Sequence, residues 1–344
     1  MTRGRLARMV AVGALVAALA AVGGSLWAWR ELNRPYAGWS GSSAEVVVEP
    51  GLDAGSVLQR LFQAGVVRRP GLARAWLALE GRADRLRAGE YRFDAPASCL
   101  EVLDRIARGD VLLHAVTLPE GLTLVAIAAR LEQAGFGPRA EQVAVFRDPS
   151  PILDLDPQAL DLEGYLYPDT YHFPRGTSPE RIAAALVGRF REVLGGSFLD
   201  EAERSGLGLR GAVILASMIE RETAVAAERA RISRVFHNRL AQGMRLECDP
   251  TVIYAIERSG GSVTRLTYAD LRFESEWNTY VVAGLPQGPI GSPGRESLLA
   301  AVRPEPGQDL YFVAAPGGGH RFSSDFSAHL RAVAEWRSYV RSSR

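Results

Sequence analysis

One glutamate near the middle of the chain stands where its neighbours predict an apolar helix face. In ILASMIERETAVAAERARISRVF, residues 214–236, five apolar residues lie three, four or seven positions from Glu222: Leu215, Met218, Ile219, Val225 and Ala226. These spacings place them on one stripe of a helix together with Glu222. Glu220 falls on a different face, about 200° round the helix axis.

A carboxyl in such a position suits acid–base chemistry. Burial against apolar side chains disfavours the charged form and raises the pKa of a carboxyl. A carboxyl that is still protonated near neutral pH can protonate a leaving oxygen and, once ionised, act as a base. The pattern makes Glu222 a candidate acid/base, although a buried Glu–Arg pair or a helix face rotated from this estimate would also account for it.

Two further segments carry carboxylates or hydrogen-bonding side chains. GMRLECDPTVIYAI (243–256) contains Glu247 and Asp249, and Asp249 also fits a helix N-cap followed by proline. The segment 277–302 begins with Asn278 and Tyr280 and is dense in glycine and proline. A segment of this composition is typical either of a binding groove or of a surface loop.

Aromatic residues and histidines mark two other segments. LEGYLYPDTYHF (162–173) predicts either a surface on which sugar rings stack or a packed aromatic core. GGGHRFSSDFSAH (317–329) predicts a flexible turn that carries His320.

Composition excludes several function classes. The formal net charge of the 344 residues is +1, so no basic domain indicates nucleic acid. The five histidines show no HExxH or HxH pattern, and the two cysteines, Cys99 and Cys248, have no metal-ligand spacing, so we expect no metal and no other cofactor. Two independent thiols are favoured over a disulfide.

The N-terminus predicts a membrane anchor. Residues 9–29 contain no charge, follow Arg3, Arg5 and Arg8, and end with two tryptophans. A helix of this length spans about 30 Å, the thickness of a hydrocarbon core. The run is too long for a typical signal peptide, the rival interpretation suggested by ALA at 18–20. The positive-inside rule places residues 1–8 in the cytoplasm and everything after the anchor outside it.

The remaining chain predicts an α+β fold in two parts. After a linker at 30–43, a small α/β module at 44–116 alternates short strands and helices, and a larger helix-rich domain follows at 117–344. Periodicity and capping residues predict the following elements: strands at 44–50, 88–93, 111–119 and 310–316, and helices at 55–65, 69–81, 98–109, 123–135, 178–196, roughly 211–241, and a short one beginning at 267–270.

Five motifs in order along the chain carry a family resemblance. EGYLYPDTY, ASMIERETA, VFHNRL with GMRLECDPTVIYA, NTY with GLPQGPIGSPG, and LYFVA with GGHRFS together resemble the YceG-like family of endolytic murein transglycosylases. The resemblance covers nearly the whole chain, including the anchor. It implies a single-pass inner-membrane enzyme that cuts nascent peptidoglycan strands internally, between N-acetylmuramic acid and N-acetylglucosamine.

The resemblance also implies roles for individual residues. The catalytic glutamate of the family, the second of an E-x-E-T pair, falls on Glu222, which agrees with the stripe argument. Nine residues would support it or bind substrate: Glu220, Thr223, Glu247, Asp249, Thr251, Tyr254, Asn278, Tyr280 and His320. Three positions depart from the family pattern, one of them Trp277, where the family has a tyrosine. Glu247, often glutamine, either raises the pKa of Glu222 by like-charge repulsion or faces solvent. Cys248 replaces a small hydroxyl residue.

The implied reaction needs one carboxyl group. It protonates the glycosidic oxygen, the C6 hydroxyl of the muramic acid attacks C1, and a 1,6-anhydro end results. Ordinary glycosidases use two carboxyls, so a hydrolase with Asp249 activating water is one alternative. A non-catalytic scaffold that binds glycan is another. The module at 44–116 resembles a LysM-like unit, and association with the wall-synthesis machinery follows from the family resemblance alone.

Overall fold

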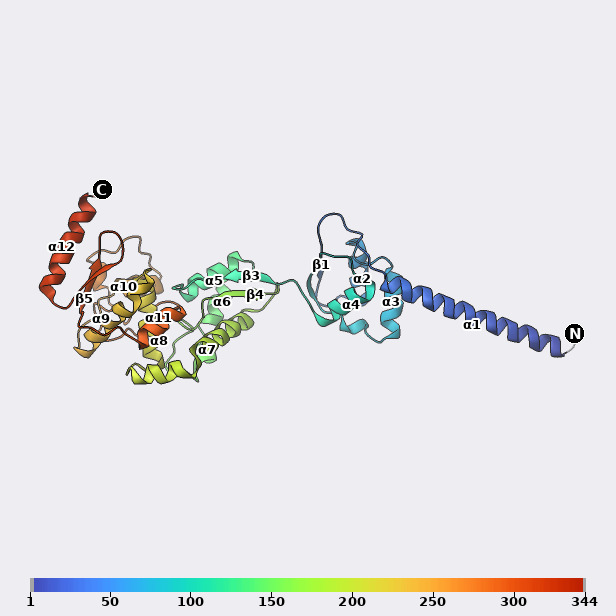
Figure 1. Cartoon of the computed structure of the whole chain (residues 1–344), viewed down its shortest axis with the longest axis horizontal. Helices are drawn as coiled ribbons and strands as arrows, with labels where there is room; N and C mark the ends of the chain where they lie inside the picture. Colours follow the sequence, from blue (N-terminus) through green and yellow to red (C-terminus); the bar gives the residue numbers. More distant parts are fainter. Residues whose placement is uncertain (1–2, 343–344) are drawn as a thin grey trace. The chain divides into compact units, whose positions relative to one another are not determined.

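The chain folds into two compact units, each with its own core (Figure 1). The computed structural model describes residues 3–342. The first unit holds residues 3–114 and 172–175, and the second holds residues 115–171 and 176–342.

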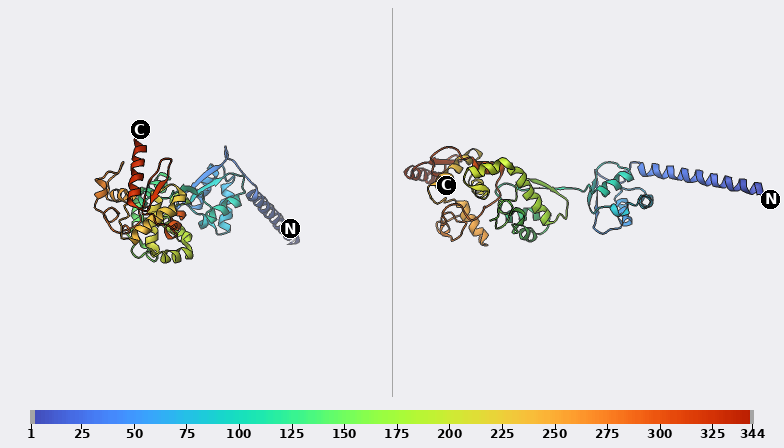
Figure 2. Two further views of the ribbon diagram at one scale, coloured as in Figure 1. Left: turned by 60° about the vertical axis from the view of Figure 1, so that its left-hand side comes forward. Right: turned by 90° about the horizontal axis from the view of Figure 1, so that it is seen from below.

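The first unit begins with a long apolar helix, α1 (Arg3–Asn33), which Figure 2 shows as a straight rod. Its stretch Ala7–Asn33 has a mean hydropathy of 2.2 and is long and apolar enough to cross a membrane. Its apolar side chains are exposed from Met9 to Leu26, as expected for a helix whose solvent is lipid rather than a protein core. The helix is therefore consistent with a single-pass anchor.

The end of α1 and the chain that follows it are fixed to the rest of the first unit. Leu32 is buried, and Glu31 lies 3.2 Å from Arg69 Nε. The amide of Tyr36 donates to the carbonyl of Ala97, and that of Gly38 donates to Gly65. The segment predicted as a linker, 30–43, begins within α1, and backbone hydrogen bonds attach its later residues to the module.

The module is built on a two-stranded antiparallel sheet covered by helices. Ala44 and Val46 of β1 pair with Phe93 and Tyr91 of β2, and all four side chains are buried in the core. The elements of the unit are β1 (Ala44–Val48), α2 (Ala54–Gln63), α3 (Pro70–Leu79), the 3₁₀ turn η1 (Ala83–Arg85), β2 (Gly89–Phe93) and α4 (Cys99–Arg108). The predicted elements between 44 and 109 are confirmed to within two residues at either end.

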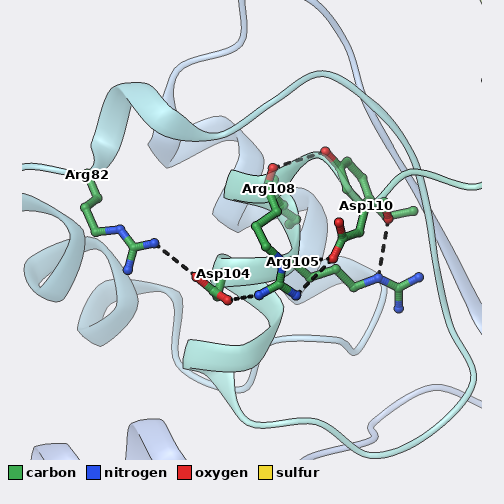
Figure 3. Close-up of polar contacts among 7 residues, drawn as sticks. Arg82, Asp104, Arg105, Arg108 and Asp110 are labelled. Atoms are coloured by element: carbon green, nitrogen blue, oxygen red, sulfur yellow. Dashed lines mark hydrogen bonds and ion pairs between the residues drawn. The ribbon is translucent and has the colours of Figure 1, made fainter.

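Side-chain caps explain why these short helices begin where they do. Asp53 accepts a hydrogen bond from the Ser56 amide, and Ser98 and Glu101 form a reciprocal capping box. On the surface of α4, Asp104 bridges Arg82 and Arg108, and Arg108 also pairs with Asp110 (Figure 3). Such exposed pairs contribute little to stability.

The second unit packs helices around the central helix α8 (Gly208–Glu222), which is buried along most of its length. The helices of the unit are α5 (Leu124–Gln133), α6 (Arg139–Phe146), η2 (Ser150–Ile152), α7 (Pro179–Arg204), α8, η3 (Ala226–Glu228), α9 (Arg229–Ala241), α10 (Asp249–Arg258), η4 (Asp270–Arg272), α11 (Arg295–Val302) and α12 (Phe326–Ser342). Two pairs of strands complete the fold: β3 (His114–Thr117) pairs with β4 (Thr170–Phe173), more than 50 residues away in sequence, and β5 (Tyr311–Ala314) forms an antiparallel hairpin with β6 (His320–Ser323).

The predicted helix at 211–241 is wrong, because it is two helices with a break. Helix α8 ends at Glu222, and Thr223 adopts an extended conformation with φ −139° and ψ 137°. The Thr223 hydroxyl accepts a hydrogen bond from the amide of Val225, a local bond that competes with the helical one. Val225, predicted to continue the apolar stripe, is 39% exposed.

Two more predictions need correction. Helix α7 extends to Arg204, beyond the predicted end at 196, with a non-helical break at Gly195, whose φ of 59° favours glycine. The segment 317–329 is not a flexible turn throughout. It contains three left-handed glycines, then strand β6, and then the start of α12.

Candidate active site

Glu222 is the last residue of α8, with its neighbours on the helix stripe buried. Leu215, Met218 and Ile219 are fully buried. Glu222 itself keeps part of its surface exposed, so a substrate can reach it. Burial is the main cause that raises the pKa of Glu222 to about 7. The nearby carboxylate of Asp249 raises it further, whereas the Cys248 thiol and Arg239 oppose the rise.

The thiol of Cys248 donates a hydrogen bond to Glu222, with Sγ 3.3 Å from Oε2. Cys248 is itself buried, and its amide donates to Thr279 Oγ1 at 2.9 Å. The Thr251 hydroxyl donates to the Cys248 carbonyl at 2.6 Å and lies 2.9 Å from the Thr279 hydroxyl. Thr251, a predicted supporting residue, therefore fixes the backbone that carries Cys248.

Asp249 begins α10 and is held by a tyrosine. Tyr280 donates its hydroxyl proton to Asp249 Oδ1 at 2.6 Å. The N-cap of α10 is Cys248, one residue before the predicted position, and Pro250 occupies the first turn. Asp249 and Tyr280 therefore form a pair beside Glu222.

Arg239 of α9 is a buried guanidinium that sequence reasoning did not single out. Its Nε donates to the carbonyl of Leu310, and its Nη1 donates to Leu246 at 2.9 Å. Nη1 also lies 3.2 Å from the carboxylate of Glu247. No periodicity marks such a residue, because an arginine on a polar helix usually faces solvent.

Glu247 does not act as a second carboxylate beside Glu222. Its side chain is half exposed and pairs with Arg239. Its φ of 50° is positive, which is uncommon for a residue other than glycine. Of the two alternatives for Glu247, the structure shows the solvent-facing one, and the carboxylate that raises the pKa of Glu222 is that of Asp249.

Glu220 lies on the other side of α8 and holds a different part of the fold. Its Oε1 is 3.3 Å from Arg229, and its Oε2 accepts the amide of Gly294 at 2.9 Å. This bond ties the start of α11 to the end of α8. Glu120, which sequence reasoning did not single out, lies close to Glu220 and has a pKa raised by partial burial and by that neighbouring carboxylate.

Thr223 connects the catalytic candidate to the β5–β6 hairpin. Its hydroxyl is 3.5 Å from Glu228 Oε2, and the same oxygen is 2.7 Å from His320 Nδ1. The amide of His320 donates to the other carboxylate oxygen of Glu228. Burial would raise the pKa of Glu228, but these hydrogen bonds from His320 outweigh it and lower the pKa.

Asn278 and Tyr254 are placed in structural networks. The Asn278 side chain is buried, donates to the carbonyls of Leu271 and Phe273, and accepts the amide of Tyr280. Tyr254 donates to the buried carboxyl of Glu163 at 3.1 Å. Burial is the main cause that raises the pKa of Glu163 to about 8. Asn278 thus positions Tyr280 rather than presenting a free amide.

Within residues 3–342, no three His, Cys, Asp or Glu side chains gather closely enough to hold a metal ion. What the site offers is a proton donor with a raised pKa, set beside a thiol and a tyrosine-bound carboxylate.

Comparison with known proteins assigns this chain to a family. The model of the YceG-like family matches residues 46–335. The chain belongs to the YceG-like family. The relatives include an endolytic murein transglycosylase of Bacillus subtilis (strain 168), 27% identical over 333 residues that cover 92% of this chain and 91% of that one. Another, from Streptococcus pneumoniae serotype 2 (strain D39 / NCTC 7466), is 25% identical over 328 residues, 86% of this chain and 59% of that one.

A solved structure supports the family fold. The crystal structure of a YceG-like protein from Listeria monocytogenes aligns with a TM-score of 0.57 and 29% sequence identity, covering 85% of this chain and 99% of that chain. The mixed helix and sheet content therefore belongs to a YceG-like architecture. The small module stays a LysM-like prediction by resemblance.

Variants of Cys248 are expected to move the pH dependence of the Glu222 carboxyl. A hydroxyl donates a stronger hydrogen bond than a thiol, so Cys248→Ser should lower the pKa of Glu222. Cys248→Ala removes the donor and should raise it, each shift being about one pKa unit or less. The midpoint of the pH profile for glycan cleavage measures both shifts. Cys99→Ser, in the other unit, is the matched control, and an identical midpoint in all the variants would show that the thiol does not influence Glu222.

Proposed function

We propose that this protein is a membrane-anchored endolytic transglycosylase that cleaves the bond between N-acetylmuramic acid and N-acetylglucosamine within peptidoglycan strands. The observation that carries the proposal is Glu222, a partly exposed residue at the end of a buried helix, whose carboxyl has a pKa raised to about 7. The support from relatives is that two of them are named endolytic murein transglycosylases. No metal or other cofactor enters the proposed reaction.

The proposed chemistry uses Glu222 twice. Its protonated carboxyl donates to the glycosidic oxygen as the bond from that oxygen to C1 of the muramic acid breaks. The C6 hydroxyl of the same sugar bonds to C1, and its proton passes to the carboxylate of Glu222. Atoms and charge balance without water, and the product is a 1,6-anhydro end. Because Glu222 is protonated again at the end, one carboxyl suffices.

The position of Asp249 favours this reaction over hydrolysis. A hydrolase would need a second carboxylate that is free to activate water. Asp249 is the carboxylate that acts electrostatically on Glu222, but it accepts a 2.6 Å hydrogen bond from Tyr280. In our proposal, Asp249 helps to keep the pKa of Glu222 high, and Asp249 and Tyr280 line the sugar site. Thr223, Glu228 and His320 hold the chain that leaves Glu222.

The test is the chemical nature of the new glycan end. Full-length protein in detergent is incubated with uncrosslinked glycan strands, and the products are analysed by mass spectrometry. Anhydro ends, lighter than reducing ends by one water molecule, are the expected result. Reducing ends would identify a hydrolase and point to Asp249. Binding of glycan without cleavage would identify the scaffold.

The activity is expected to fall as the pH rises through about 7. The general acid must be protonated, and the pKa of Glu222 is raised from 4.5 to about 7. Above that pH, kcat/KM should decrease about tenfold per pH unit, because the protonated fraction does so. An ordinary glutamate would give this decline from about pH 4.5 instead. A pH–rate profile measures it, and a decline centred near 4.5 would contradict the assignment of Glu222.

The anchor and the module complete the proposal. In it, α1 spans the inner membrane with residues 1–8 in the cytoplasm, as Arg3, Arg5 and Arg8 indicate. The module at 44–116 would act as a LysM-like glycan-binding unit, and the domain at 117–344 would cut outside the cytoplasm. Association with wall-synthesis proteins rests on family resemblance.

A further inference from the structure

The end of α1 and the connection between α2 and α3 form one basic surface. Arg69 lies with Cζ 5.3 Å from the ring centroid of Trp27, and Arg68 lies 5.7 Å from that of Tyr36. Both arginines also approach the carboxylate of Glu31, at 3.5 Å and 3.2 Å. These contacts fix the module against the last turns of the helix.

The length of α1 sets the height of this surface in a bilayer. The 27 residues of Ala7–Asn33 rise about 40 Å, which matches a bilayer with its headgroup layers. The hydrocarbon core of about 30 Å takes about 20 of those residues. When α1 spans the membrane, Trp27 therefore lies near the edge of the hydrocarbon core, and Glu31 and Leu32 lie among the head groups.

The module must then lie in the headgroup layer as well. Trp27 precedes the end of α1 by six residues, or about 9 Å along the axis. Arg69 stacks on the ring of Trp27, so the α2–α3 connection lies at the depth of the lipid phosphates. A tryptophan at the core edge with arginines just outside it is typical of an interfacial contact.

The charge of the surface fits anionic lipid. The end of α1 and the α2–α3 connection carry four arginines, at positions 30, 34, 68 and 69, and one acid, Glu31, which gives a net charge of +3. Arg68 and Arg69 remain 46% and 51% exposed. The positive-inside rule accounts for arginines at one flank of a span, here Arg3, Arg5 and Arg8, and it disfavours a second basic cluster at the other flank. Attraction to anionic head groups accounts for that second cluster.

We propose that the first unit lies directly on the membrane surface, with Arg68 and Arg69 in contact with the phosphates of anionic phospholipids around the end of α1. The proposal rests on α1 as a membrane span and does not depend on glycan cleavage. The module is then held at the membrane surface beside α1, rather than connected to its anchor by a flexible linker.

The test uses full-length protein in lipid nanodiscs made of phosphatidylcholine alone or mixed with phosphatidylglycerol. Hydrogen–deuterium exchange is followed in peptides that cover residues 64–74. Phosphatidylglycerol is expected to slow exchange there several-fold in the wild type. The double variant Arg68→Gln/Arg69→Gln should lose this response. The matched control Arg82→Gln/Arg108→Gln removes two arginines that pair with Asp104 on the same module (Figure 3) and should keep it.

Several results would overturn the proposal. They are equal exchange in both lipids, an unchanged response in the Arg68/Arg69 variant, loss of the response in the control, or the same slowing when inorganic phosphate is added to phosphatidylcholine nanodiscs. Exchange in β1 and β2 reports whether the double variant still folds. If it does not, Glu31→Gln provides the second test. That variant removes the shared protein partner of both arginines but keeps their charge, so it must retain the response to phosphatidylglycerol.

Discussion

Replacing Glu222 by glutamine is expected to abolish glycan cleavage and leave the fold intact. Glutamine fills the same volume and accepts the Cys248 thiol proton, but it has no acidic proton to give to the glycosidic oxygen. A positioned general acid contributes about 10²–10⁴ in rate, and here the same group also acts as the base. The loss in kcat/KM should therefore be at least about 100-fold. It is measured from anhydro ends formed by the variant and the wild type.

The matched control is Glu257→Gln, which changes an exposed glutamate on α10 in the same way. It should cleave like the wild type. Thermal unfolding of both variants shows whether a loss is chemical or structural. The pKa of Glu222 is higher in the folded protein than in the unfolded chain, so its ionisation above pH 7 destabilises the fold. Glutamine does not ionise, so the variant should unfold at the same temperature or a higher one. Normal cleavage by Glu222→Gln would remove Glu222 from the mechanism.

Replacing Arg239 by methionine is expected to destabilise the second unit strongly and to reduce cleavage. Arg239 is a buried guanidinium that bonds the carbonyls of Leu310, Arg245 and Leu246. Removing it leaves these acceptors without their donor in a dry site. A buried acceptor left without its partner costs about 1–3 kcal/mol. The segment it holds leads directly into Cys248, so the hydrogen bond to Glu222 should also be disturbed.

Denaturant unfolding of the full-length protein measures this effect, with Arg245→Met as the matched control. Arg245 is an exposed arginine in the same segment, and its loss should change the free energy of unfolding by about 0.5 kcal/mol or less. Equal stability of Arg239→Met and the control would show that the network is not structural. Unchanged cleavage by a destabilised Arg239→Met would show that the segment does not position the site.

The sequence predicts well those elements whose local signals agree with the fold. Helix α4 has a capping box at Ser98 and a left-handed glycine at its end, and its predicted and observed bounds nearly coincide. Glu222 is predictable for a similar reason, because the three apolar residues before it mark a buried face. Burial, the cause of its raised pKa, follows from that pattern.

The missed features depend on contacts that no local pattern encodes. The break at Thr223 comes from a hydroxyl that bonds the backbone of Val225 and reaches Glu228, and the apolar pattern continues through it without a gap. In the sequence, Arg239 resembles a surface residue on a polar helix. Its burial depends on contacts with distant segments, such as its hydrogen bond to the carbonyl of Leu310. The bond between Cys248 and Glu222 joins residues 26 positions apart. Tertiary structure decides each of these cases.

The burial of Cys248 gives the protein a built-in chemical reporter. The residue is 1% exposed and its thiol has a pKa raised well above the ordinary value, mainly by burial, so an alkylating reagent cannot attack it in the closed fold. Labelling can proceed only when the junction of α8 and α10 opens, and its rate measures the free energy of that local opening. Any ligand that occupies the Glu222 site and holds the junction shut should therefore slow the alkylation of Cys248, which makes binding visible even for glycans that are not cleaved.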